Sequence, residues 1–333
     1  MKPVIFGLAG PVLTADEAAF FRDAEPAGFI LFKRNCENRE QLRALTDALR
    51  DLTGRADLPI LIDQEGGRVA RLQPPEWPAF PAGPAFDALY EKAPISAIEA
   101  ARANAQAIGL MLAEVGITVD CLPLLDVSGA ETTEAIATRA YGREPSRVAA
   151  MGRAVLEGLA AGGVIGVVKH MPGHGRARVD SHHLLPTVGA SAEELAADLA
   201  PFQALKDAPM GMTAHIVFEA WDADRPATLS PIVIEQVIRR AIGFDGLLMT
   251  DDIDMKALSG SAGEKAAGAL AAGVDLVLDC WARMPEMEEI AARIGDIAPA
   301  SRARLDRAMA ALEAPQGDAA ELAAKRDALL ALA

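Results

Sequence analysis

The chain has 333 residues, 51% of them hydrophobic and 24% charged, a composition typical of a globular protein with one large core or two ordinary domains. The net charge of −15 argues against nucleic acid and anionic membranes as partners, because their phosphate groups would be repelled. The N-terminus lacks the long apolar stretch and the cleavage site of a signal peptide, and no apolar run reaches the roughly 18 residues of a membrane span. We therefore expect a cytoplasmic protein without a membrane partner.

Short apolar runs with β-branched residues recur along almost the whole chain. Most are apolar at nearly every position, as expected of parallel strands that are buried on both faces. Cys121 and Cys280 sit in such runs, and with Cys36 they are interpreted as free thiols, because the cysteines are odd in number and far apart. The eight predicted strands are 4–10, 28–33, 58–63, 117–126, 164–169, 210–218, 246–251 and 273–279.

The segments between these runs carry signals for helices. Asn38 is placed to cap a helix with its apolar stripe in 42–52, and Gln41 stands at the capping-box position. Ser191 and Glu194 form the same signal for a later helix. Strands and helices therefore alternate.

Helix signals continue towards the C-terminus. An apolar stripe in 148–159 and a proline after Ser230 mark two more helices, whereas the prolines of 73–84 predict a rigid loop. Eight strands that alternate with helices predict an α/β fold, a (β/α)8 TIM barrel, with a doubly wound open sheet as the alternative. We expect a single domain, 1–333, with a C-terminal helical extension at about 284–333.

All five histidines lie in one part of the chain, after or at the end of the fifth and sixth predicted strands. They are His170, His174, His182, His183 and His215. In a TIM barrel the loops that follow the strands build the active face, so this clustering favours a functional role for the group.

The first two histidines belong to a loop rich in glycine. His170 and His174 have the spacing of a helical metal site, but Pro172, Gly173 and Gly175 interrupt any helix there. The segment is interpreted as a loop that folds over a substrate.

Asp180 and His182 stand two residues apart in the same loop. A turn would allow the carboxylate to bind one imidazole nitrogen and leave the other for proton transfer. The alternative is an aspartate that only caps a turn.

Carboxylates follow the seventh predicted strand. Asp251 is the first acid after the apolar run and is predicted to point into the mouth of the barrel. Asp252 is expected to support it, and Asp254 is a candidate cap of the next helix.

Charged residues also follow the third and fourth strands. Asp63 opens a segment, 63–72, that holds an acid, two adjacent glycines and two arginines, including Arg71. Such groups suit a ligand rich in hydroxyl groups, although a turn with a surface ion pair is the simpler alternative. Asp126 ends the fourth strand, and Arg139 follows in the next loop.

Three segments together resemble glycoside hydrolase family 3, and within it the bacterial β-N-acetylhexosaminidases of cell-wall recycling. They are DQEGGRVARL at 63–72, KHMPGHG with DSH at 169–182, and TDD at 250–252. The second segment is highly specific, and the resemblance covers nearly the whole chain. The chain departs from the family pattern at Met171, where Phe is usual, and at 250–254, which reads TDDID in place of SDDLS.

The resemblance implies a role for particular residues. Asp251 matches the nucleophile of the family, and His182 matches its general acid and base, with Asp180 as partner. A retaining mechanism through a covalent glycosyl-aspartate follows from these roles. The residues that match sugar-binding positions of the family are Asp63, Arg71, Arg139, Lys169 and His170.

The expected activity is removal of terminal β-linked N-acetylglucosamine from a small carbohydrate, either a muropeptide or a chitooligosaccharide. We expect a monomer without cofactor or metal. The alternatives are a β-glucosidase or a phosphorylase of the same family, a barrel hydrolase with a histidine-bound metal, a Schiff-base enzyme that uses Lys169, and a sugar-binding module without catalysis.

Overall fold

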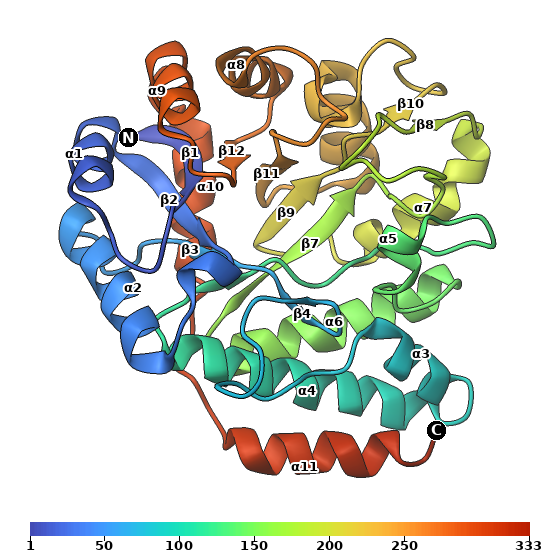
Figure 1. Ribbon diagram of the computed structural model, residues 1–333. Helices are drawn as coiled ribbons and strands as arrows, with labels where there is room; N and C mark the ends of the chain where they lie inside the picture. Colours follow the sequence, from blue (N-terminus) through green and yellow to red (C-terminus); the bar gives the residue numbers. More distant parts are fainter.

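The computed structural model describes residues 1–333 as a closed barrel of eight parallel strands (Figure 1). The strands follow one another around the barrel in chain order, and the first pairs with the last through Val4 and Val277. The TIM barrel is therefore confirmed, and the open sheet is wrong. The barrel strands are β1 (Lys2–Gly7), β2 (Pro26–Leu31), β3 (Ile60–Ile62), β6 (Val119–Asp120), β7 (Ile165–Met171), β9 (Met210–Thr213), β11 (Leu247–Asp252) and β12 (Leu276–Asp279).

Two barrel strands fall furthest short of the ranges that the sequence predicts. The fourth, expected at 117–126, is regular only in β6, because Pro123 has no N–H to donate. Beyond it only Leu124 forms a bridge, to Lys169. The sixth strand ends at Thr213, and its expected continuation forms β10 (Val217–Phe218), which pairs with β8 (Thr187–Val188) outside the barrel.

Helices surround the barrel as a ring in which α1 contacts α2, α6 contacts α7 and α9 contacts both α8 and α1. The proline-rich segment forms turns and ends where α3 begins. The helices are α1 (Ala15–Ala24), α2 (Arg39–Thr53), α3 (Gly83–Tyr90), α4 (Pro94–Glu114), α5 (Glu134–Ala137), α6 (Pro145–Ala161), α7 (Ala192–Ala204), the π-helical η3 (Val233–Ile242), α8 (Ala262–Ala272), α9 (Met284–Arg293), α10 (Pro299–Met309) and α11 (Ala319–Leu330).

The capping residues set the start of several helices. Asn38 caps α2 by accepting a hydrogen bond from the backbone N–H of Gln41 at 2.9 Å, as predicted. The Gln41 side chain, however, accepts from the N–H of Glu37 and so does not complete a capping box with Asn38. Ser191 and Glu194 form the full box at the start of α7.

The core has two parts. One fills the barrel with side chains such as Ile5, Leu61 and Met249, and the other lies between the strands and the helices. Leu305 and Met309 of α10 pack on the interior cluster, and α11 runs along α4 (Figure 1). Helix α10 therefore packs against the barrel interior, whereas α11 lies against α4.

Short strands and turns extend from the carboxyl ends of the barrel strands. β4 (Gln64–Gly66) and β5 (Val69–Ala70) form a hairpin directly after β3, and β8 and β10 pair after β7 and β9. All three cysteines are free thiols. No helix has the length and the apolar character needed to cross a membrane.

Candidate active site

The predicted site residues gather at the carboxyl ends of three barrel strands. Asp63 follows β3, Lys169 and His170 lie near the end of β7, and Asp251 lies near the end of β11. In a parallel barrel these ends open on the same face. The fold thus brings together side chains that are far apart in the sequence.

Lys169 is the centre of a buried ionic network. Its Nζ lies 3.1 Å from Asp63 Oδ1 and 2.7 Å from Glu65 Oε1, and the side chain is only 2% exposed. Arg71 Nη2 donates to the other oxygen of Asp63 at 2.8 Å. Arg139 binds both oxygens of Glu65, through Nε at 2.8 Å and Nη2 at 2.6 Å.

The charges in this network stabilise one another. Burial acts to raise the pKa of Asp63, but Lys169 and Arg71 hold that pKa well below its usual range. Burial acts to lower the pKa of Lys169, and Glu65 and Asp63 together raise it above its ordinary value. Lys169 is therefore a cation and not the neutral amine that a Schiff base requires. The Schiff-base alternative is not supported.

His170 is oriented by a buried aspartate. Its Nδ1–H donates to Asp126 Oδ2 at 2.7 Å, and Asp126 Oδ1 accepts the backbone N–H groups of His170 and His174. Burial, the largest single effect, acts to raise the pKa of Asp126, but the charges and hydrogen bonds of His170 and His174 together lower it to about 2. The His170 ring is thus fixed with Nε2 free of this bond.

Asp251 is partly exposed at the end of β11. Its Oδ1 accepts the backbone N–H of Asp252 at 2.8 Å. Burial acts to raise its pKa, but the imidazoles of His170 and His215 and this hydrogen bond keep the pKa below its ordinary value. Asp251 is therefore an anion at neutral pH, as a nucleophile must be.

Asp180 and His182 form the predicted pair. His182 Nδ1–H donates to Asp180 Oδ1 at 2.7 Å, and the same oxygen accepts the His182 backbone N–H at 3.0 Å. Both residues lie in the loop between β7 and β8, and the imidazole is 62% exposed. His182 also contributes to the lowering of the Asp251 pKa. The pair leaves His182 Nε2 free for a proton.

The remaining histidines have different surroundings. Burial, with His170 as a second cause, lowers the pKa of His174 to about 4, and its Nε2 lies 3.2 Å from Ser181 Oγ. His215 is held between Thr228 Oγ1 and the carbonyl oxygen of Asp252. His183 is exposed. The histidines do not converge as metal ligands, since the one group with the spacing of a metal site consists of three aspartates.

Asp254 has a different partner from the one predicted. It does not cap the next helix, because Ser261 caps α8 in a box with Glu264. Its carboxylate instead pairs with Arg283 at 2.6 Å. The cap interpretation is therefore wrong, and the reason is that residues 253–260 form turns before the helix begins.

Sequence reasoning did not select Glu65 as a site residue. Its place directly before two glycines gave no sign that it binds both Arg139 and Lys169, which lie 74 and 104 residues further on. Its position inside the segment 63–72 was the only local signal.

Comparison with known proteins agrees with this geometry. The family described as Glycosyl hydrolase family 3 N terminal domain matches residues 11–312. The chain belongs to glycoside hydrolase family 3. A β-hexosaminidase of Chromobacterium violaceum is 37% identical over 313 residues, which are 91% of this chain and 84% of that protein. One of Bordetella avium is 34% identical over 95% of this chain and 90% of its own length.

Solved structures of the family have the same fold. NagZ from Neisseria gonorrhoeae in complex with N-trifluoroacetyl-D-glucosamine has a TM-score of 0.87 and 33% identity, over 99% of this chain and 98% of that one. A β-N-acetylglucosaminidase of the family from Paenibacillus has a TM-score of 0.87 and 31% identity, over 98% of this chain and 66% of that one. The prediction of a glycoside hydrolase is confirmed.

Proposed function

We propose that this chain is a retaining exo-β-N-acetylglucosaminidase that removes terminal β-linked N-acetylglucosamine from muropeptides derived from peptidoglycan. The observation that carries the proposal is the Asp180–His182 pair on the loop after β7, on the same face of the barrel as the Asp251 carboxylate. The relatives named β-hexosaminidase support the sugar specificity.

Asp251 is the nucleophile in this mechanism. Its anionic carboxylate attacks the anomeric carbon of the bound sugar, and a glycosyl-aspartate forms as the bond to the leaving oxygen breaks. Because the attack and the later hydrolysis each invert the anomeric carbon, the released sugar keeps the β configuration.

His182 moves the proton in both steps. Protonated at Nε2, it gives this proton to the leaving oxygen, and in the second step it takes a proton from the attacking water. Asp180 binds Nδ1–H in both steps, so it fixes the tautomer and stabilises the imidazolium. Histidine carries a usable proton near neutral pH without the apolar burial that a glutamic acid would need.

The ionic network binds the terminal sugar. Asp63, Arg71 and Arg139 offer carboxylate and guanidinium groups for sugar hydroxyls, Lys169 adds a donor beside them, and His170 adds its free Nε2. Most of these side chains are already held by one another, so little side-chain entropy is lost when the sugar binds.

The decisive experiment traps the intermediate. The wild-type protein is incubated with a slowly hydrolysed fluorinated β-N-acetylglucosaminide, and the intact mass is expected to rise by one glycosyl group. Peptide mapping should place this group on Asp251. A label on another residue, or hydrolysis that inverts the anomeric centre in an NMR time course, would contradict the proposal.

Two comparisons define the substrate and the acceptor. Turnover of chromogenic β-N-acetylglucosaminide should exceed that of β-glucoside, and N-acetylglucosamine should be released from a muropeptide. Turnover should be independent of added phosphate. A rate that needs phosphate would identify a phosphorylase, and equal rates on the two glycosides would remove the N-acetyl specificity.

A further inference from the structure

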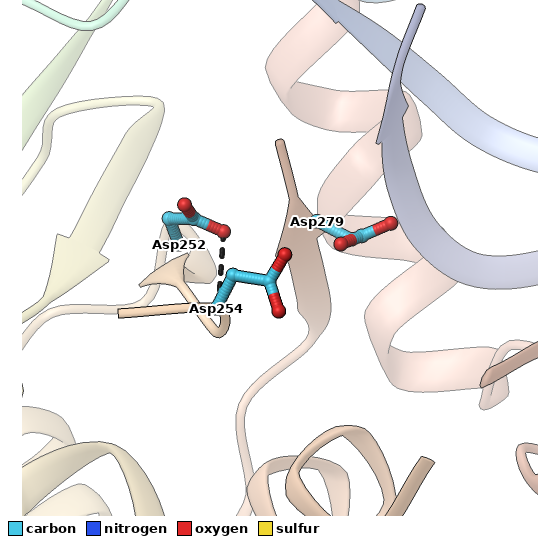
Figure 2. Close-up of side chains that lie close together, drawn as sticks. All are labelled: Asp252, Asp254 and Asp279. Atoms are coloured by element: carbon cyan, nitrogen blue, oxygen red, sulfur yellow. Dashed lines mark hydrogen bonds between the residues drawn. The ribbon is translucent and has the colours of Figure 1, made fainter. Parts of the chain in front are cut away.

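Three aspartates converge beside the proposed nucleophile, outside the ionic network. Figure 2 shows Asp252 and Asp254, from the end of β11 and the turn after it, next to Asp279 at the end of β12. One carboxylate oxygen from each of the three lies within 4.8 Å of the others. None of the steps proposed for the reaction uses them.

Asp279 has no hydrogen-bond partner, and burial raises its pKa to about 8. The residue is only 1% exposed, and both of its carboxylate oxygens are buried without any hydrogen bond. A buried carboxylate in this state is costly, because it has lost water and gained nothing in return. It lies among the two other carboxylates, so a cation in their midst would supply the missing partner.

Free oxygens are also available on the other two aspartates. The backbone N–H groups of Asp254 and Cys280 both donate to Asp252 Oδ1, which leaves Asp252 Oδ2 open. Arg283 binds Asp254 through Oδ2, which leaves Asp254 Oδ1 open. Each aspartate therefore has at least one oxygen that accepts no hydrogen bond from the protein.

Few cations balance the three aspartates. Arg283 is the one cation in contact with them, and it is shared with Glu286, to which its Nε donates at 2.6 Å. Lys265 acts on Asp254, and Arg34 on the other two aspartates, only at a distance. A divalent cation bound to the three carboxylates in their ionised form would supply the charge that these cations do not.

We propose that Asp252, Asp254 and Asp279 bind a calcium ion. Carboxylate oxygens are ligands for hard cations, whereas zinc prefers nitrogen and sulfur. Ligand oxygens on opposite sides of one calcium lie about 4.6–5.2 Å apart, and on one magnesium only about 4.0–4.2 Å, so oxygens that lie within 4.8 Å of one another suit the longer distances around calcium. Asp252 and Asp254 are partly exposed, and water completes the coordination from that side.

Such an ion would hold the end of β11. The Asp252 backbone N–H donates to Asp251 Oδ1, and the Asp252 carbonyl oxygen accepts the Nε2–H of His215. An ion bound to the Asp252 side chain restrains this peptide and so positions Asp251. Binding of the ion itself does not depend on the proposed function.

The test measures binding directly. The full chain is treated with EDTA, dialysed, and titrated with calcium chloride at pH 7.5 in a calorimeter. We expect one calcium per chain and a saturable rise of about 2–4 °C in Tm. Asp279→Asn should lose this binding but remain folded, because an amide of the same shape relieves the repulsion in the empty site.

Matched variants separate a site from general attraction to an acidic protein. Asp254→Asn should weaken calcium binding at least about tenfold, as expected for loss of a charged ligand. Asp23→Asn, which removes an exposed carboxylate on α1, should bind calcium like the wild type. Magnesium at the same concentration should give a smaller rise in Tm.

Three outcomes would overturn the proposal. The first is no heat of binding and no change in Tm with calcium, as expected if the aspartates hold protons instead. The second is equal calcium binding by Asp279→Asn and the wild type. The third is magnesium that binds as tightly as calcium, which would reject the assignment of the ion.

Discussion

The two parts of the proposed site differ in how they are held. The network of Asp63, Glu65 and Lys169 is buried and each of its charges has at least one partner, whereas the Asp180–His182 pair lies on an exposed loop with one hydrogen-bonded contact between its side chains. A buried network keeps its geometry before the ligand arrives. A group on an exposed loop is free to move towards the leaving oxygen when the sugar is bound.

This difference separates binding from proton transfer. Changes in the network should affect stability and sugar binding together, because the charges hold one another as well as the ligand. Changes in the exposed pair should affect the rate alone. Substitutions in the two parts test this separation.

His182→Ala should lower kcat by about 10²–10⁴-fold on substrates with a sugar leaving group, because no other group delivers the proton. The loss should be smaller on aryl glycosides with good leaving groups. Tm should not change, since the imidazole is 62% exposed. Steady-state kinetics on both substrates and calorimetry measure these effects, and equal losses on both would argue against an acid role.

Lys169→Met should lower the free energy of unfolding by about 3–5 kcal/mol, because it leaves Asp63 and Glu65 buried without their shared cation. Denaturant unfolding at pH 7 measures the change. The exposed Lys206→Met is the control and should be neutral. Unchanged stability of the Lys169 variant would mean that the network is not held by its charges.

Asp126→Asn should remove a negative charge whose stabilisation of the fold depends on pH. The pKa of Asp126 is about 2 in the folded chain, below its unfolded value, so its charge stabilises the fold above about pH 4 and this contribution is lost as the pH falls towards 2. We expect the free energy of unfolding of the wild type to exceed that of the variant by about 2 kcal/mol at pH 7, and the two values to approach each other near pH 2. Denaturant unfolding across this range measures the difference, and a constant difference would contradict the prediction.

Arg178→Gln should change the free energy of unfolding by less than about 0.5 kcal/mol. Arg178 pairs with Glu131 on the surface, where the two side chains are 73% and 69% exposed, and water and salt screen such pairs. Denaturant unfolding at low and high salt measures this. A loss above 1 kcal/mol would show that the loop before His182 is held more firmly than its exposure indicates.

Local patterns in the sequence predicted much of the fold. Apolar runs located all eight barrel strands, and the capping signals at Asn38 and Ser191 marked the starts of α2 and α7. The ends of strands were harder to predict, as Thr213 shows, because apolar residues continue into segments that pair elsewhere. An apolar side chain is buried in either place, so its pattern does not distinguish them.

Neighbours along the chain define the order of strands and helices, the Asp180–His182 pair and the acids that follow buried strands, so the amino-acid sequence was enough to predict them. The three-dimensional fold was needed to place Lys169 between Asp63 and Glu65 and to bring Asp279 close to Asp252. Closure of the barrel places the carboxyl ends of distant strands on one face. Which charged groups pair depends on their distance in space, and the spacing of residues along the chain does not reveal that distance.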